Sequence, residues 1–68
     1  MISAVEVFEK DHIWHLVCPP INRSEKIDYI DPEEYAKSEN QKVEIEGQVT
    51  STIIYLIEDK RGFIEWKA

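Results

Sequence analysis

With 68 residues, 43% of them hydrophobic, the chain suits one small domain and is too apolar to be disordered. Its net charge is −6, and residues 25–46, here called the acidic segment, hold eight acidic and three basic residues. This balance argues against direct binding of nucleic acid or of anionic membrane. The single cysteine, Cys18, excludes an internal disulfide. Because the sequence has no signal-peptide pattern and no long apolar run, we expect a cytoplasmic protein.

Alternate side chains in residues 2–9 and 12–18 form one largely apolar face and one mixed face. Both segments include β-branched and aromatic residues, which predicts two strands. A tight turn at Lys10 and Asp11 would pair them as a hairpin with Val7 opposite Trp14. The same register predicts the pairs Val5 with Leu16, Ser3 with Cys18, and, on the other face, Glu6 with His15. Pro19 and Pro20 would end the second strand, because proline cannot donate to a strand ladder.

The next elements are less regular. Residues 27–29 fit either a short edge strand or an ordered loop. Asp31 and Pro32 then form a helix-start signature, in which Asp31 caps the helix and Pro32 occupies a position where its missing N–H costs nothing. Glu34 falls at the capping-box position. We therefore expect one short helix near residues 32–39, of two turns at most.

The C-terminal third predicts three strands. Residues 42–48 alternate, with Val43 and Ile45 on the buried face, and residues 49–58 form a second β-rich stretch. Gly47 would mark a bend or bulge between them. Residues 59–62 form a hairpin loop in which Gly62 can adopt positive φ. The last strand, residues 63–66, would place Ile64 opposite Ile57 and Trp66 opposite Tyr55.

This order of elements predicts a mostly β, α+β domain spanning residues 1–68. The architecture is either a small antiparallel sheet or a partly closed SH3-like barrel of four to five strands, with one short helix. Tryptophan and β-branched residues on the inward faces supply most of the expected core. That core is Val5, Val7, Trp14, Leu16, Val43, Ile45, Ile53, Tyr55, Ile57, Ile64 and Trp66.

His12, His15 and Cys18 are metal-ligand types at spacings of three. On the predicted strand His12 and Cys18 point one way and His15 the other, and no fourth Cys or His is available for a structural zinc site. A buried, apolar Cys18 is a simpler interpretation than a Cys18 that binds a metal or acts as a nucleophile. We expect no metal, no cofactor and no catalytic residue.

The acidic segment offers a different kind of site. Its carboxylates do not match a calcium loop, and capping and solubility account for most of them. Tyr29 and Tyr35 bracket its densest part, and tyrosine is enriched at protein interfaces. The candidate partner-binding residues are therefore Tyr29, Glu33, Glu34 and Tyr35. The alternative is that both tyrosines simply pack the helix onto the sheet.

These observations favour a small acidic protein–protein interaction module without catalysis, such as an adaptor, inhibitor or accessory protein of the kind found in bacteria and phage. Its partner would be a protein with a basic surface. The alternative is a DNA mimic that blocks a nucleic-acid-binding protein, which requires acids spaced like phosphates on one face. A metal protein or enzyme using His12, His15 and Cys18 ranks last. We also expect some homo-oligomerisation through an edge strand, for which residues 42–48 are a candidate.

Overall fold

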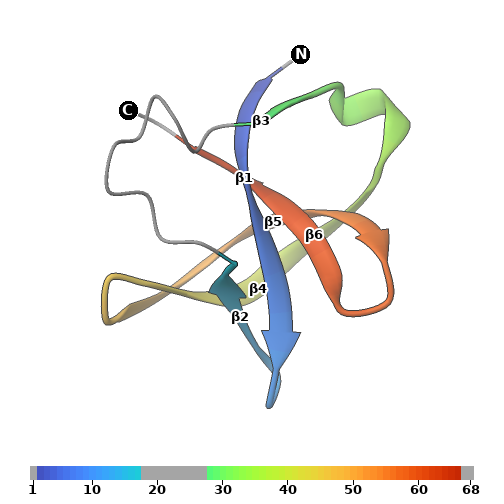
Figure 1. Ribbon diagram of the computed structural model, residues 1–68. Coiled ribbons are helices and arrows are strands. Elements are labelled where there is room, and N and C mark those ends of the chain that lie inside the picture. The colour runs from blue at the N-terminus through green and yellow to red at the C-terminus, as the bar shows by residue number, and fades with distance from the viewer. Residues whose placement is uncertain (1, 18–27, 67–68) are drawn as a thin grey trace.

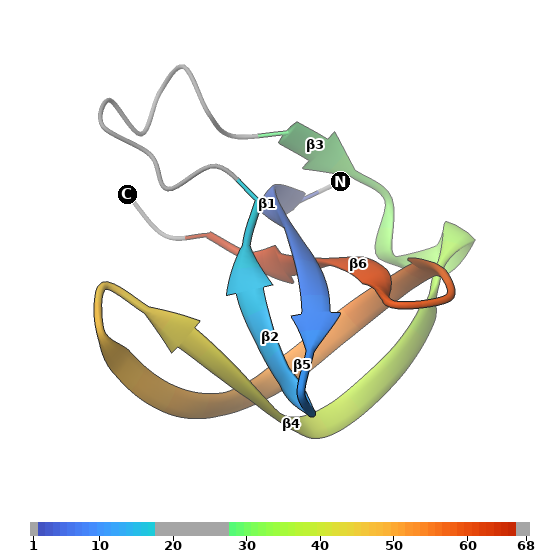
Figure 2. The same cartoon turned by 60° about the horizontal axis from the view of Figure 1, so that its bottom comes forward.

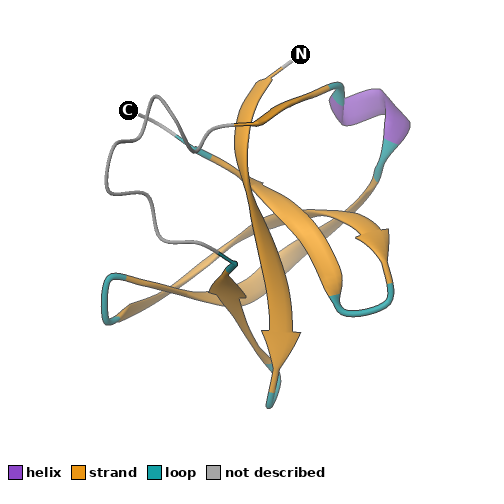
Figure 3. Ribbon diagram, viewed as in Figure 1, coloured by secondary structure: helices purple, strands orange, loops and turns teal. Residues whose placement is uncertain are grey.

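The computed structural model of the protein describes residues 2–17 and 28–66 (Figures 1 and 3). Nearly all of these residues lie in strands, joined by short turns and one turn of 3-10 helix. The elements are β1 (Ile2–Lys10), β2 (Ile13–Leu16), β3 (Asp28–Ile30), η1 (Pro32–Glu34), β4 (Ala36–Ile45), β5 (Gln48–Glu58) and β6 (Arg61–Glu65). The predicted fold class, a mostly β domain, is confirmed, with six strands instead of four or five.

The six strands form one sheet in the order β2-β4-β5-β6-β1-β3, and β2 also pairs with β1. This additional pairing bends five of the strands into a ring, while β3 extends the sheet along the first residues of β1 (Figure 2). All pairings are antiparallel except the short one between β2 and β4. The arrangement is consistent with the partly closed SH3-like barrel expected from the sequence.

The first hairpin forms with a register two residues away from the predicted one. Its turn is Asp11-His12, so Val7 lies opposite Leu16 instead of Trp14. Both turn residues have positive φ, at 54° and 68°, as a two-residue turn of the favoured twist requires. Asp and His tolerate this conformation better than most residues, which explains why Lys10 stays in the strand. A shift of two residues leaves every side chain on its predicted face. Ser3 lies opposite Tyr29 of β3, and its predicted partner, Cys18, lies outside the described residues.

The predicted helix begins where expected but ends after one turn. The Oδ1 atom of Asp31 accepts a hydrogen bond from the Glu33 backbone N–H at 3.1 Å, so Asp31 is the N-cap. Tyr35 is already extended, and β4 begins at Ala36 and pairs with β5. The expectation of helix through residue 39 is wrong, because these residues have no apolar side chains at helical spacing while β5 offers a complete strand partner.

Glu46 and Gly47 form a tight turn between β4 and β5, where the sequence predicted a bend at Gly47. Their φ values are 51° and 83°, so both residues are in the left-handed region. Glycine adopts this conformation without strain, whereas glutamate does so at a cost. A second irregularity lies between Ser38 and Gln41, where a bulge containing Asn40 at φ 63° bends β4.

Replacing Glu46 by asparagine is expected to stabilise the protein by about 0.5–1 kcal/mol, because Asn-Gly is the preferred pair for a turn with two positive φ values. The measurement is urea unfolding followed by circular dichroism. Glu46→Gln is the matched control, since it removes the same charge without relieving the backbone. Equal stability of the two variants would show that charge, not turn conformation, is responsible.

The last hairpin also differs from the predicted register. Its turn is Asp59-Lys60, and Tyr55 lies opposite Phe63 instead of Trp66. Lys60, not Gly62, adopts positive φ, at 62°. Gly62 instead lies buried in β6, where an added Cβ atom would be 2.7 Å from the backbone oxygen of Tyr55. Gly62 therefore permits close approach of two strands, a requirement that its place beside a turn did not indicate.

Buried side chains form two clusters on opposite faces of the bent sheet. The larger cluster fills the ring and consists of Val5, Val7, Trp14, Leu16, Val43, Ile54, Ile64 and Trp66. The smaller one consists of Ala4, Ile30 and Tyr55, with Ile2, Tyr35 and Phe63 packed against it. The predicted core is mostly confirmed, with Ile45 only partly buried. Ile53 and Ile57 were placed there wrongly, because they lie on the outer face of β5 and remain 38% and 39% exposed.

Candidate functional site

The two candidate tyrosines have different environments. Tyr29 lies on β3 opposite Ser3, and 69% of it is exposed. Tyr35 is half-buried, and its ring meets the Phe63 ring edge-on at 5.9 Å between centroids. It is part of the packing around the smaller buried cluster. Tyr29 is therefore available to a partner, whereas Tyr35 mainly holds the chain that follows η1 against the sheet.

Glu33 and Glu34 are both exposed on η1, which follows β3 at one end of the molecule (Figure 1). The carboxylate of Asp31 instead accepts a backbone hydrogen bond, and the Asp31 carbonyl accepts a second one from the Glu34 N–H at 3.0 Å. These two bonds fix the helical turn that carries the glutamates. Residues 28–34 contain four acids and no base, so Tyr29 lies within a locally negative stretch of chain.

The histidines do not gather around a common point. His12 is exposed in the first turn, while His15 is half-buried on the outer face of β2. The His15 ring lies 5.6 Å from the Phe8 ring, and its Nδ1 is 4.0 Å from a carboxylate oxygen of Glu44. The predicted pairing of His15 with Glu6 is wrong. Cys18 lies outside the described residues. Within residues 2–17 and 28–66 no three potential ligands of the His, Cys, Asp or Glu type could hold a metal ion.

Glu6 is engaged by Arg61 instead. The Arg61 Nε donates to Glu6 Oε2 at 2.9 Å, and its Nη1 donates to Glu58 Oε1 at 2.7 Å. The hydrogen bonds that Arg61 donates to Glu6, followed by the one that it donates to Glu58, raise the pKa of the Arg61 guanidinium above its usual value. Glu6 lies on β1, and Arg61 lies on β6 next to the last turn. The cluster therefore links adjacent strands on the outer face and uses two acids that would otherwise add to the negative surface.

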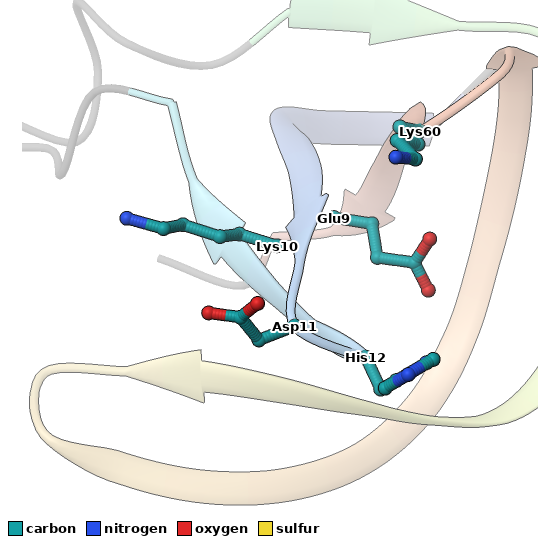
Figure 4. Close-up of a pocket in the computed structure, with 5 residues that line it drawn as sticks. All are labelled: Glu9, Lys10, Asp11, His12 and Lys60. Carbon is teal, nitrogen blue, oxygen red and sulfur yellow. The ribbon is translucent and has the colours of Figure 1, made fainter.

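A hollow of about 340 Å³ lies at the end of the barrel where the first and last hairpin turns meet. Glu9, Lys10, Asp11, His12 and Lys60 line it (Figure 4). The side chains of Lys10 and Asp11 point to one side of the hairpin, and those of Glu9 and His12 point to the other (Figure 4). This divergence does not provide the converging polar groups by which a substrate pocket orients its ligand.

The described acids are spread over the molecule. Glu33 and Glu34 lie on η1, Glu46 lies at the tip of the β4–β5 hairpin, and Asp11 lies in the first turn. Lysines on β1 and β4 are interspersed with them. The described residues therefore present acids in several directions, whereas a DNA mimic needs them concentrated on one face.

Sequence reasoning missed a group of apolar side chains on the outer surface. They are Phe8, Val17, Val49, Ile53 and Ile57, each at least 36% exposed. Three of them lie on β5, where residues 49 to 57 include no charged side chain. This charge-free run was visible in the sequence, but its inward and outward faces were exchanged, so it was interpreted as core.

Three comparisons with known proteins found no match to this chain. No family model matches it, and neither the curated proteins nor the solved structures contain a detectable match. In the described part of the chain, no helix combines the length and the apolar character needed to cross a membrane.

Proposed function

We propose that this protein is a non-catalytic interaction module that binds a basic surface of another protein through Tyr29, Glu33, Glu34 and the adjoining Tyr35. The observation that carries the proposal is the exposure of Tyr29, 69% of which is open to solvent although it lies on a strand. An aromatic ring held by a strand loses little conformational freedom on binding, which is why tyrosine is frequent at interfaces.

The charges around Tyr29 support a cationic partner. Glu33 and Glu34 are exposed, and no basic residue occurs between residues 28 and 34. Carboxylates attract lysine and arginine at long range and speed association, while a tyrosine ring can stack on a guanidinium group. A basic segment of a cytoplasmic protein is the partner that this combination fits.

The glutamates and Tyr29 are expected to affect different rate constants of binding. Glu33→Gln combined with Glu34→Gln is expected to slow association several-fold at low salt and to flatten its salt dependence, because steering is long-range. Tyr29→Ala is expected to speed dissociation roughly tenfold or more, as loss of an anchoring side chain does. Tyr35→Ala is not a clean variant, because Tyr35 packs against Phe63.

The measurement is capture of proteins from the native host's lysate by the immobilised chain, followed by surface plasmon resonance with the purified captured protein. Glu39→Gln combined with Glu46→Gln is the matched control, since both acids are exposed and lie on β4 and in the turn after it. The control should bind like the wild type. The proposal is overturned if no protein is captured, or if the captured protein binds all variants alike.

The distribution of acids favours this proposal over a DNA mimic. The control pair distinguishes the two, because a mimic uses its whole acidic face and would lose affinity when Glu39 and Glu46 are neutralised as well. Competition by duplex DNA for the captured protein gives a second readout. Equal losses from both glutamate pairs, together with displacement by DNA, would favour the mimic.

A further inference from the structure

Within the described residues, the first half of β5, residues 48–53, has a strand partner on only one side. It pairs with β4 from the Gln48–Ile45 pair to the Thr52–Gln41 pair. On its other side β6 pairs only with Tyr55, Leu56 and Glu58 and then turns away to follow β1. Figures 1 and 2 both show the β4–β5 hairpin projecting with no described strand along this side. We call residues 48–53 the β5 edge.

The backbone groups of this edge are arranged for pairing. The two-residue turn makes Ile45 and Gln48 a directly hydrogen-bonded pair, and hydrogen-bonded pairs alternate along an antiparallel ladder. The N–H and C=O groups of Val49, Ser51 and Ile53 therefore point away from β4, toward the free side. Unpaired strand groups of this kind are templates for another strand.

Other open strand edges in the described chain are protected. The first half of β4 lacks a partner on the side where β2 pairs only with Val43 and Glu44, but it carries Lys37 and Glu39 and is bent by a bulge. β3 has only three residues. Charges, bulges and short length are the usual means by which proteins prevent edge pairing. The expected edge at residues 42–48 is wrong, because its central residues pair with both β2 and β5.

The β5 edge lacks all of these protections. Residues 48–53 are free of charge in a chain of net charge −6, and every one except Thr52 is exposed. Val49 to Ile53 reads Val-Thr-Ser-Thr-Ile, so the pattern of residue types is the same in both directions. An antiparallel copy centred on Ser51 would place Val49 opposite Ile53 and Ser51 opposite itself. In that register the outward backbone groups of the two copies meet as hydrogen-bonded pairs.

From this self-complementarity we propose that the β5 edge is a homodimer interface, in which two copies join their sheets about a two-fold axis at Ser51. Opposed Val and Ile side chains favour strand pairing, and no like charges face each other across the axis. The interface is small, so association is weak and concentration-dependent. Since both copies carry net negative charge, added salt strengthens the dimer, whereas it weakens binding to a basic partner.

Charge reversal at the axis gives the test. Ser51→Lys and Ser51→Glu each place two like charges directly opposite each other, so each variant alone is expected to remain monomeric. An equimolar mixture of the two variants places opposite charges there and is expected to restore the dimer. Sedimentation equilibrium between about 10 μM and about 1 mM measures the association, with Ser51→Thr as the matched control that keeps the wild-type behaviour.

Each result has a definite meaning. Wild-type mass that rises toward twice the monomer mass, loss in both charged variants and recovery in the mixture support the interface. A monomeric wild type at about 1 mM overturns it, as does dimerisation of both charged variants at wild-type strength. Charged variants that stay monomeric even when mixed overturn the register centred on Ser51. Two-dimensional NMR spectra of each variant confirm that the monomer remains folded.

Discussion

Replacing Trp14 by alanine is expected to unfold most of the protein at room temperature. Trp14 is 4% exposed and lies in the larger buried cluster. Truncation of a buried tryptophan costs about 3–5 kcal/mol, and a domain of this size rarely has more than about 3–5 kcal/mol of stability. The substitution also removes the indole N–H that Nε1 donates to Gln41 Oε1 at 3.4 Å. Urea unfolding followed by circular dichroism measures the loss.

Trp14→Phe separates packing from hydrogen bonding. It keeps a ring in the cluster but loses the donor to Gln41, whose own amide donates to Ser38 Oγ at 2.8 Å. We expect Trp14→Phe to cost about 1–3 kcal/mol, less than the alanine variant, and to leave the sheet intact. If Trp14→Ala melts within a few degrees of the wild type, the assignment of the strand faces around the ring is incorrect.

Gly62→Ala is expected to destabilise the protein less than Trp14→Ala, because it overfills a site instead of leaving a cavity. The added Cβ would lie 2.7 Å from the Tyr55 carbonyl oxygen and 2.8 Å from the Ile54 Cγ2. The oxygen belongs to the backbone of the paired strand, so it cannot move without disturbing the β5–β6 ladder. Overpacking of this kind costs about 1–3 kcal/mol, and Gly62→Val should cost more. Thermal unfolding of both variants gives the comparison.

Gly47→Ala is the matched control for the Gly62 variants. A Cβ at Gly47 meets no atom within 4 Å, so its cost comes only from the positive φ of 83°. This strain amounts to about 1–2 kcal/mol. The expected order of destabilisation is Gly47→Ala, then Gly62→Ala, then Gly62→Val. A Gly62→Ala variant as stable as the wild type would show that the two strands can separate without loss of packing.

The sequence was a good guide to the strand faces of β1 and β2 and a poor one to register. Alternation places Val7, Trp14 and Leu16 inside in any register that shifts by an even number of residues, so the larger cluster was predictable. The register itself depends on the turn, and the sequence Lys10-Asp11-His12 contains no glycine to locate it. On β5 the two faces were exchanged, because Ile54 and Leu56 point into the ring whereas Ile53 and Ile57 lie on the outer face.

The candidate site was predictable only as a stretch of sequence. The composition of residues 28–34 indicates an acidic surface, but the exposure of each tyrosine depends on partners far along the chain. Tyr35 is half-buried because Phe63 on β6 lies beside it. Tyr29 is exposed because it points away from the face of β3 on which Ile30 is buried. Residues 36–39 were assigned to the helix because their strand partner, β5, is also distant in sequence.

The two buried clusters are built from neighbouring residues of the same strands. On β1, Ala4 belongs to the smaller cluster and Val5 to the larger one, and on β5 Tyr55 and Ile54 are divided in the same way. A local opening that releases either strand from one cluster must therefore disturb the other. Despite its two-sided packing, the protein is expected to unfold as a single cooperative unit, without a partly folded form in which one cluster survives alone.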